Sequence, residues 1–407
     1  MARLPEQAEI IEPRYVPGLP NETDAIASAL RQPVAGPPLR DRVRAGARVA
    51  IVICDVTRPF PARRVLPVLL KELTGHRVTV FIATGTHRPC TEAELAEMLG
   101  PVLERCDVVQ HDAFDRSRHA QLGTVLGTST PALVERAFLE HDVRITTGFI
   151  EPHFFAGFSG GPKMVAPGLA AIETVLDLHS AARIGHSSAT WGITDGNPVH
   201  DAVRDIAARA DVTFNLDVTL NRDHAITAVF GGDLFASHAD GCAFARSTAM
   251  VSVERPFDVV LTTNSGYPLD QNLYQTVKGI SAAAQVVKHG GSIVVASECS
   301  DGLPDHGQYK DLLRQADGPA AFLNHLAVPD FSAHDQWQVQ VQALIQQKAR
   351  VLVHASGLTD AQLRDAWFEP ADDPAACASS LLAAAGPDGT LAVLPQGPQT
   401  IPYLRTE

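Results

Sequence analysis

Three side chains capable of proton or covalent chemistry fall within one short stretch, residues 145–168, ITTGFIEPHFFAGFSGGPKMVAPG. The stretch begins as an apolar strand, becomes rich in glycine, and carries Glu151, His153 and Lys163 among small and aromatic residues. A carboxylate, an imidazole and an amine are groups that enzymes use as acids, bases and nucleophiles. Glycines let backbone approach a ligand closely. The stretch therefore predicts a loop that wraps a cofactor or a substrate.

The lysine of this stretch, Lys163, follows Gly160, Gly161 and Pro162, which only partly matches the phosphate-binding pattern G-x-x-x-x-G-K-[ST]. Pro162 stands where the second glycine belongs, and Met164 follows the lysine. The sequence therefore does not favour a P-loop nucleotidase. Lys163 remains a candidate for contacting phosphate or for acting as a covalent nucleophile.

Unusual polar groups also follow several Val- and Ile-rich runs that are typical of buried parallel strands. Four loops share this placement: 54–59 after the run 48–53, 84–89 after 77–83, 151–153 after 143–148, and 264–271 after 257–263. Open α/β sheets bind ligands outside the carboxyl ends of their strands. Four such loops, two of them with a histidine, predict a single cleft lined by both lobes.

Each of these residues also has a purely structural interpretation. Asp55 could cap a helix that starts near Pro59, His87 could be an ordinary loop histidine, and His153 could be a packed, hydrogen-bonded one. Arg58 is harder to explain in that way, because its planar fork suits a carboxylate or a phosphate. A partly desolvated His153 between a Glu-Pro pair and two phenylalanines could instead act as a base.

Two further positions are read from helical spacing. His179 shares the apolar face of a helix expected over residues 170–184, because it continues an i, i+3, i+4, i+7 pattern. Such a histidine is usually a core residue; as a metal ligand it would need an ion held mostly by other groups. Gln275 and Lys278 lie three residues apart on another expected helix and share a face, either as an exposed pair or facing the cleft.

The elements that must position these residues alternate between short apolar runs and longer helical patterns. Further strands are expected at 291–297 and 350–356, and helices at 62–73 and 92–100. The alternation predicts an α/β protein of two lobes, with mostly parallel sheets covered by helices and the active site in the cleft between the lobes. We expect an N-terminal domain over residues 1–253, to which 388–407 return, and a C-terminal domain over 254–387.

The composition limits the class of protein. A chain of 407 residues is expected to form roughly two or three domains, and 45% hydrophobic with 19% charged residues is typical of a folded globular protein. A formal net charge of −13 argues against nucleic-acid and anionic-membrane partners. The six cysteines are scattered without a C-x-x-C pair, and the N-terminus has no apolar signal segment. We therefore expect a cytoplasmic protein that does not enter a membrane.

Taken together, the motifs resemble those of the nickel-dependent lactate racemase family. The matching pieces are DVTRPFP (55–61), ATGTHRP (83–89), GFIEPHFFAGFSGGPK (148–163), His179 and GYPLDQNLYQTVKG (266–279). The resemblance implies a racemase or epimerase that inverts C2 of a 2-hydroxy acid, with lactate as the first candidate. It also implies hydride transfer to and from a nickel-pincer nucleotide, pyridinium-3,5-bisthiocarboxylic acid mononucleotide with nickel, and a dependence on the enzymes that build this cofactor.

The same resemblance implies a role for each matching residue. His87 and His153 match two catalytic histidines, Lys163 matches the lysine that joins the cofactor covalently, and His179 matches the nickel ligand. The remaining residues match contacts to the cofactor (Asp55, Thr57, Gly160, Gly161) or to the substrate (Arg58, Gln275, Lys278, Trp337).

Three alternatives stay open. The same chemistry could act on another 2-hydroxy acid, such as malate, an aromatic hydroxy acid or a sugar acid. A nicotinamide-dependent dehydrogenase is disfavoured because no G-x-G-x-x-G follows the first strand. A non-catalytic carrier of the nickel cofactor is disfavoured because a carrier needs no pair of acid/base histidines.

Overall fold

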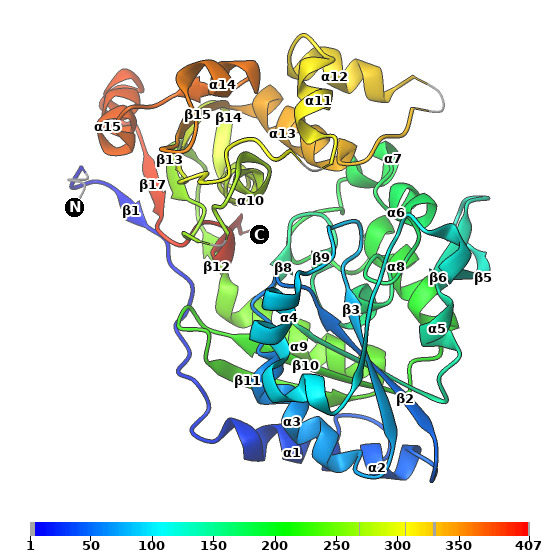
Figure 1. Ribbon diagram of the computed structural model, residues 1–407. Helices are drawn as coiled ribbons and strands as arrows, with labels where there is room; N and C mark the ends of the chain where they lie inside the picture. Colours follow the sequence, from blue (N-terminus) through cyan, green and yellow to red (C-terminus); the bar gives the residue numbers. More distant parts are fainter. Residues whose placement is uncertain (1–4, 268, 306, 329–330, 406–407) are drawn as a thin grey trace. The chain divides into compact units, whose positions relative to one another are not determined.

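The computed structural model describes residues 5–267, 269–305, 307–328 and 331–405 (Figure 1). The protein has an α/β fold with mostly parallel sheets, as the alternation of apolar runs and helical patterns predicts. Its chain divides into two compact units, each with its own central sheet. The N-terminal unit contains Tyr15–His179 and Ser188–Ser247, and the C-terminal unit contains Met1–Arg14, Ser180–Ser187 and Thr248–Glu407.

The N-terminal unit is built on a six-stranded sheet in the order β11-β10-β7-β2-β3-β4, in which only β11 is antiparallel to its neighbour. The strands are β2 (Arg48–Cys54), β3 (Arg77–Ala83), β4 (Asp107–Gln110), β7 (Val143–Phe149), β10 (Phe214–Leu220) and β11 (Ile226–Gly232). Every residue of β2 from Val49 to Ile53 is fully buried. This is the burial expected of a central parallel strand covered on both faces.

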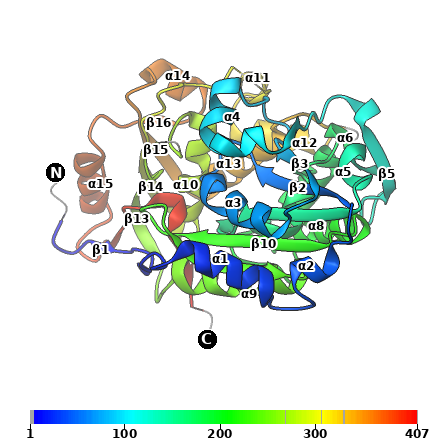
Figure 2. The same ribbon diagram turned by 60° about the horizontal axis from the view of Figure 1, so that its bottom comes forward.

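Helices and short hairpins surround this sheet. The helices are α1 (Glu22–Arg31), α2 (Leu39–Arg42), α3 (Ala62–Glu72), α4 (Glu92–Leu99), α5 (Arg136–Leu139), α6 (Ile172–Leu178), α8 (Pro198–Arg209) and α9 (Leu234–Ala249). Helices α1 and α3 pack side by side, as Figure 2 shows. Two antiparallel hairpins, β5 (His119–Thr124) with β6 (Pro131–Glu135) and β8 (Pro152–His153) with β9 (Gly157–Phe158), complete the unit.

The C-terminal unit has an entirely parallel six-stranded sheet in the order β1-β17-β13-β14-β15-β16. The strands are β1 (Glu9–Ile10), β13 (Phe257–Thr263), β14 (Val287–Ala296), β15 (Arg350–His354), β16 (Glu369–Pro370) and β17 (Leu391–Leu394), while β12 (Met250–Val253) pairs with β18 (Ile401–Leu404). The helices are α7 (Ala181–Ile184), α10 (Leu273–Ala284), α11 (Tyr309–Arg314), α12 (Pro319–Leu326), α13 (Gln336–Lys348), α14 (Asp360–Asp365) and α15 (Pro374–Ala384).

Alternate residues of this second sheet enter two different cores. Val260, Ile293 and Val353 belong to a large core with residues of α10, α11 and α13. Val259 and Leu352 belong to a smaller core with residues of α15. Because successive side chains of a strand point to opposite faces, these apolar runs have to be covered by helices on both sides.

The course of the last strand differs from the expectation. Residues 388–407 do not return to the N-terminal unit, because β17 pairs in parallel with β13 and lies inside the C-terminal sheet. The chain also passes between the units several times, so the division is not a single boundary near residue 253. Hydrophobic periodicity identifies a strand, but it does not identify which strand lies beside it.

The helix expected over residues 170–184 is in fact two helices. α6 ends at Leu178, His179 is its C-cap, and Ser180 is extended before α7 begins at Ala181. α7 belongs to the C-terminal unit, where Gln340 of α13 donates a hydrogen bond to the Ala181 carbonyl (2.8 Å). This tertiary contact and the extended Ser180 interrupt a pattern that is helical by spacing alone.

Two smaller findings bear on the cysteines and on membranes. All six cysteines are free thiols. Among the described residues, no helix combines the length and the apolar character that crossing a bilayer requires.

Candidate active site

The register of the N-terminal sheet brings three of the predicted loops to one edge. Strands β2 and β3 pair in register to their last residues, Cys54 opposite Ala83, and β7 lies on the other side of β2. The loops that follow these parallel strands therefore begin side by side at the carboxyl edge of the sheet. The fourth predicted loop follows β13 and belongs to the sheet of the C-terminal unit.

His87 and Asp55 form a close pair at this edge. The Nδ1 atom of His87 lies 2.7 Å from Oδ2 of Asp55, whose carboxylate is only 3% exposed. Thr57 donates to the other carboxylate oxygen through its backbone N–H (3.2 Å) and its hydroxyl (2.5 Å). Burial acts to raise the pKa of Asp55, but the charge and hydrogen bond of His87, with Arg58 and Thr57, hold it below its ordinary value. The carboxylate therefore stays ionised and accepts the Nδ1–H of His87.

Arg58 closes the turn that Asp55 begins. Its backbone N–H donates to the Asp55 carbonyl (3.2 Å), and its Nη1 donates to the carbonyl (3.1 Å) and hydroxyl (3.0 Å) of Thr57. Asp55 is not a helix cap, because α3 begins only at Ala62 with Pro61 as its N-cap. The structural interpretation that the sequence allowed for Asp55 is therefore wrong, and its carboxylate serves His87 instead.

His153 is held in a different way. It lies at the end of β8, and its Nδ1 accepts backbone N–H groups from Ala156 (3.3 Å) and Phe155 (3.5 Å). Its ring stacks on Phe154, with centroids 4.9 Å apart, and meets the edge of Phe155 at 4.5 Å. A backbone N–H can only donate, so the Nδ1 of His153 carries no proton and the neutral ring is protonated at Nε2.

Lys163 stands in a 3₁₀ helix, Gly161–Met164, that follows the β8–β9 hairpin. Its Nζ lies 5.7 Å from the centroid of the Phe155 ring, a cation–π distance. The turn after this helix is tied to the loop of His87, because the N–H of Gly85 donates to the carbonyl of Gly168 (3.1 Å). The loop that carries Lys163, called the lysine loop below, is thus hydrogen-bonded to the loop that carries His87.

The glycines before Lys163 are required by the fold. Gly160 has φ of +73° and Gly161 has φ of +47°, a region that favours glycine. A Cβ on Gly161 would lie 2.4 Å from Cδ2 of His238 on α9. Backbone and ring pack here without room for a side chain, so both glycines serve the conformation of the lysine loop.

One ring nitrogen of His179 has a defined partner within α6. Its Nδ1–H donates to the Val175 carbonyl one turn back in α6 (2.7 Å), and the residue is buried. This leaves Nε2 with the lone pair, the usual arrangement of a metal-ligating histidine. The His179 ring meets the Phe155 ring edge-on at 5.1 Å. Phe155 therefore contacts His153, Lys163 and His179 together.

The predicted substrate contacts Gln275, Lys278 and Trp337 lie in the C-terminal unit. Gln275 and Lys278 are on the half-buried face of α10, and Asn272 caps this helix by accepting the N–H of Gln275 (3.1 Å). Trp337, in the first turn of α13, donates its indole N–H to the hydroxyl of Tyr274 (3.1 Å). The three residues therefore belong to two helices joined by that hydrogen bond. Pro268 of the matching segment is outside the described residues.

Comparison with known families agrees with this arrangement. The profile described as "Lactate racemase N-terminal domain" matches residues 2–192, and "Lactate racemase C-terminal domain" matches residues 253–401.

The chain belongs to the lactate racemase family.

Individual relatives support this membership, which makes the protein an isomerase of the racemase class. The lactate racemase of Thermoanaerobacterium thermosaccharolyticum is 33% identical over 388 residues, 94% of this chain and 90% of that protein. The lactate racemase of Lactiplantibacillus plantarum is 34% identical over 341 residues, 82% of this chain and 78% of that protein. These matches confirm the family that the sequence motifs indicated.

Solved structures give the same result for the fold. The lactate racemase apoprotein from T. thermosaccharolyticum superposes with a TM-score of 0.91 at 30% identity, covering 99% of this chain and 97% of that chain. A protein from Thermotoga maritima superposes with a TM-score of 0.73 at 20% identity, covering 96% of this chain and all of that one, and shares the fold.

Sequence reasoning missed several residues that shape this lactate racemase family site. Phe155 was noted only as an aromatic neighbour of His153, yet its ring contacts His153, His179 and Lys163. His200 and His238 lie behind the lysine loop, where burial lowers the pKa of each to about 4 and keeps both rings neutral. Asp217 lies in the middle of β10. A carboxylate inside a buried strand was the one signal in the sequence that could have identified it.

Asp217 anchors the backbone of the lysine loop by a hydrogen bond. Its Oδ2 accepts the backbone N–H of Gly161 (2.9 Å) and the side-chain amide of Asn215 (3.0 Å). Burial raises the pKa of Asp217 to about 7, against the hydrogen bonds from Asn215 and from the N–H groups of Gly161 and Gly148. The carboxyl group is therefore largely protonated below neutrality in the folded protein.

This shift predicts an unusual pH dependence of stability. Between about pH 4 and pH 7 folded Asp217 keeps a proton that the unfolded chain releases, so its contribution to stability falls as pH rises through this range. Asp217→Asn should remove this pH-dependent loss of stability. A pKa raised from 3.8 to about 7 corresponds to a loss in the free energy of unfolding of up to about 4 kcal/mol. Urea unfolding at pH 5 and pH 8 measures the difference between the two proteins, in which the titration of His200 and His238 cancels.

The exposed Asp240 of α9 provides the matched control, and Asp240→Asn is expected to track the wild type at both pH values. A difference between Asp217→Asn and wild type that is the same at pH 5 and pH 8 would contradict the raised pKa.

Proposed function

We propose that the protein racemises a 2-hydroxy acid, with lactate as the first candidate, and that its working form carries a nickel-pincer nucleotide. Membership of a family whose relatives are named lactate racemases supports the reaction class. The observation that carries the proposal is a pair of histidines whose Nδ1 atoms have opposite partners. His87 donates to the Asp55 carboxylate, whereas His153 accepts from backbone N–H groups.

The opposite partners set the two rings for opposite tasks. With Nδ1 protonated, neutral His87 has its lone pair at Nε2 and can accept a proton. With Nδ1 unprotonated, neutral His153 has its proton at Nε2 and presents a hydrogen-bond donor there, and it can act as an acid once its ring has gained a second proton. The hydroxyl groups of the two enantiomers point to different sides of C2, so inversion in both directions needs an acid/base for each. Two rings in complementary states meet that need.

The residues present fit the proposed cofactor. The ring of the buried His179 is oriented by the Val175 carbonyl, and one imidazole nitrogen is compatible with planar nickel(II) completed by other donors. Lys163 offers an amine beside Phe155 for the covalent link, and Thr57, Asp55, Gly160 and Gly161 are proposed to contact the nucleotide. The chemistry supplied by the bound cofactor would be the acceptance and return of a hydride.

Substrate binding is assigned to the remaining residues by family resemblance. Arg58 and Lys278 are proposed to hold the carboxylate and the carbonyl oxygen through charge-assisted hydrogen bonds. Gln275 and Trp337 are proposed to contact the rest of the substrate. Because Trp337 is joined to α10 through Tyr274, a change at Trp337 is expected to affect this helix as well.

A chiral assay tests the function. Protein produced together with the cofactor-building enzymes would be incubated with each enantiomer of lactate, malate, an aromatic hydroxy acid and a sugar acid. We expect both enantiomers of lactate to converge on the same mixture. Convergence on another acid alone would retain the chemistry and replace the substrate. Nickel-loaded protein that inverts none of them would overturn the proposal in favour of a carrier.

Asp55 provides a separate prediction for this mechanism. Asp55→Asn is expected to lower the racemisation rate by about 10²–10⁴-fold, because the variant lacks the negative charge that fixes the His87 tautomer and stabilises the protonated ring. Since the pKa of Asp55 is below its ordinary value, the carboxylate is charged from about pH 5 upward and the loss should not vary with pH there. Initial rates across that range measure it, and rates within twofold of wild type would rule out the role.

A further inference from the structure

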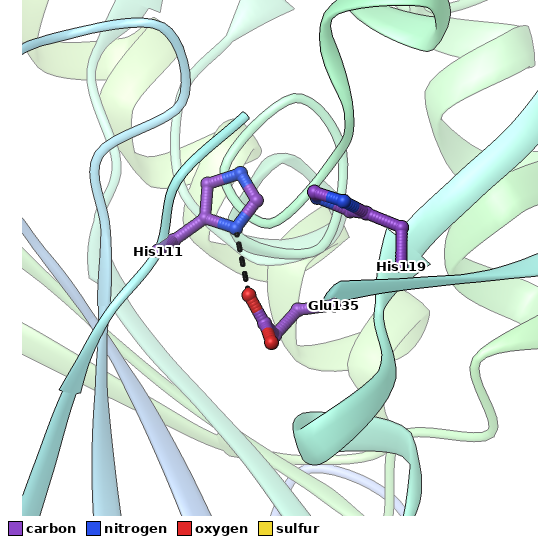
Figure 3. Close-up of side chains that lie close together, drawn as sticks. All are labelled: His111, His119 and Glu135. Carbon is purple, nitrogen blue, oxygen red and sulfur yellow. Dashed lines mark hydrogen bonds and ion pairs between the residues drawn. The ribbon is translucent and has the colours of Figure 1, made fainter. Parts of the chain in front are cut away.

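A second group of potential metal ligands lies in the N-terminal unit. His111 directly follows β4, His119 begins β5 and Glu135 ends β6, and all three are buried. One ligand atom from each lies within 4.8 Å of the others. His119 and Glu135 face each other in the β5–β6 hairpin register, which explains why their side chains meet. Figure 3 shows the three side chains pointing toward one another.

Both imidazoles are oriented by a backbone carbonyl at the nitrogen that faces away from the group. The Nε2 of His111 bonds to the carbonyl of Ala170 (3.1 Å), and the Nδ1 of His119 bonds to the carbonyl of Asp115 (2.9 Å). The inward nitrogen of His111, Nδ1, lies 3.2 Å from Oε2 of Glu135. A carbonyl on one nitrogen and a lone pair on the other is the usual setting of a metal-binding histidine.

The inward nitrogen of His119 is the second observation. Its Nε2 is buried and has no hydrogen-bond partner in the part of the chain that the structure describes. Buried polar atoms in native proteins nearly always have a partner, and an exception calls for an ion or a water as that partner. An ion among these three side chains would satisfy His119, His111 and Glu135 at once.

We propose that His111, His119 and Glu135 bind a divalent transition-metal ion of the zinc type, separate from the cofactor assigned to His179. Two imidazoles and one carboxylate form a known set of three zinc ligands, with water at a fourth position. Bonds of about 2.0–2.2 Å in a tetrahedral site place ligand atoms about 3.3–3.5 Å apart. The 3.2 Å between His111 and Glu135 is close to this spacing, and His119 would have to move by up to about 1.5 Å to reach it from a separation of at most 4.8 Å.

The alternative to a metal ion is a second proton on His111, which would make its ring an imidazolium. Nη2 of Arg118, which also donates to the Gln110 carbonyl (2.9 Å), lies 3.1 Å from Oε2 of Glu135, so a buried triad of imidazolium, carboxylate and guanidinium is the alternative. That triad satisfies His111 and Glu135 but leaves Nε2 of His119 without a partner. Of the ion and the proton, the ion accounts for both histidines.

The proposed zinc site is connected through hydrogen bonds to two segments of the proposed active site. The carbonyl of His111 accepts the hydroxyl of Thr84 (2.8 Å), in the loop that leads to His87. Ala170, which His111 also contacts, lies just before α6, the helix that His179 caps. An ion would thus tie the β5–β6 hairpin to the segments that carry His87 and His179.

Metal analysis of untagged protein made without the cofactor-building enzymes tests the proposal. After a chelator wash and equilibration with micromolar zinc, we expect about one zinc per chain. His119→Gln should lose this zinc. His179→Ala should retain it, which separates the site from the proposed nickel site. His141→Ala is the matched control, because both nitrogens of that ring already have partners, the Ala137 carbonyl and the Thr79 hydroxyl. Zinc-free wild type, or equal zinc in His119→Gln, would overturn the proposal.

The wild-type protein provides a test that does not depend on the folding of a variant. Zinc should raise its Tm, and a chelator should reverse the rise, because an ion that binds only the folded state stabilises it. Cobalt(II) in place of zinc should give the visible absorption of a tetrahedral site. A Tm that zinc does not change, together with featureless cobalt spectra, would leave the proton as the occupant and refute the metal site.

Discussion

Alanine at His87 or at His153 is expected to lower the rate of racemisation by about 10²–10⁴-fold in both directions. In the proposed mechanism each ring serves one enantiomer as base and the other as acid, so a catalytic cycle in either direction uses both. The remaining histidine is not expected to substitute, because Asp55 and the backbone of the β8–β9 hairpin hold the two rings in opposite tautomers. Initial rates from each pure enantiomer, measured by chiral chromatography on cofactor-loaded protein, check the prediction.

The control for this pair is His289, an exposed histidine in β14, where alanine should leave both rates unchanged. Nickel content has to match among the proteins, so that a lost rate reports acid/base chemistry and not loading. A rate near that of the wild type in either His87→Ala or His153→Ala would refute the assignment of two bases.

Lys163→Ala is expected to eliminate both the covalent cofactor and the activity. Lys163 carries the amine proposed for the covalent link to the cofactor. Its loop is held by two hydrogen bonds, one from Gly161 to Asp217 and one between Gly85 and Gly168. Intact-mass analysis of protein made with the cofactor-building enzymes should show the adduct on wild type and none on the variant. We expect racemisation to fall by at least about 10³-fold, since the chemistry needs a cofactor held in position.

Two further variants sharpen this result. Lys163→Arg retains the positive charge but offers no amine nucleophile, so it should also lack the adduct. Lys71→Ala, at an exposed lysine of α3, should carry the adduct and full activity. An adduct of unchanged mass on Lys163→Ala would place the link elsewhere in the chain.

Local sequence patterns predicted much of the fold and named the residues from which the candidate site is proposed. The runs 48–53 and 77–83 became β2 and β3 nearly to the residue, because strands buried on both faces are continuous apolar runs. The polar residues after those runs were correctly expected at one edge of a sheet, since parallel strands share the direction of their carboxyl ends. The motifs that contain His87, His153 and Lys163 were sufficient to indicate the family.

Partners distant in sequence could not be read in the same way. The spacing of residues 170–184 is helical throughout, and only the contact of α7 with α13 shows why the helix breaks at His179. Residues 388–407 were expected to return to the N-terminal domain, but β17 lies beside β13, a neighbour that is specified by packing across the whole sheet. Periodicity is a local property, whereas pairing depends on all of the elements that compete for an edge.

The sequence by itself determined which residue types are available for chemistry and which strands end beside them. Only the tertiary structure decided what each side chain does, because a ring nitrogen takes its role from its hydrogen-bond partner. Asp55 favours the His87 tautomer with the proton at Nδ1, and the hairpin backbone favours the His153 tautomer with the proton at Nε2. The same is true of His111, His119 and Glu135, which are separated in the sequence and carry no motif. They become a candidate metal site only because strand register places their side chains together.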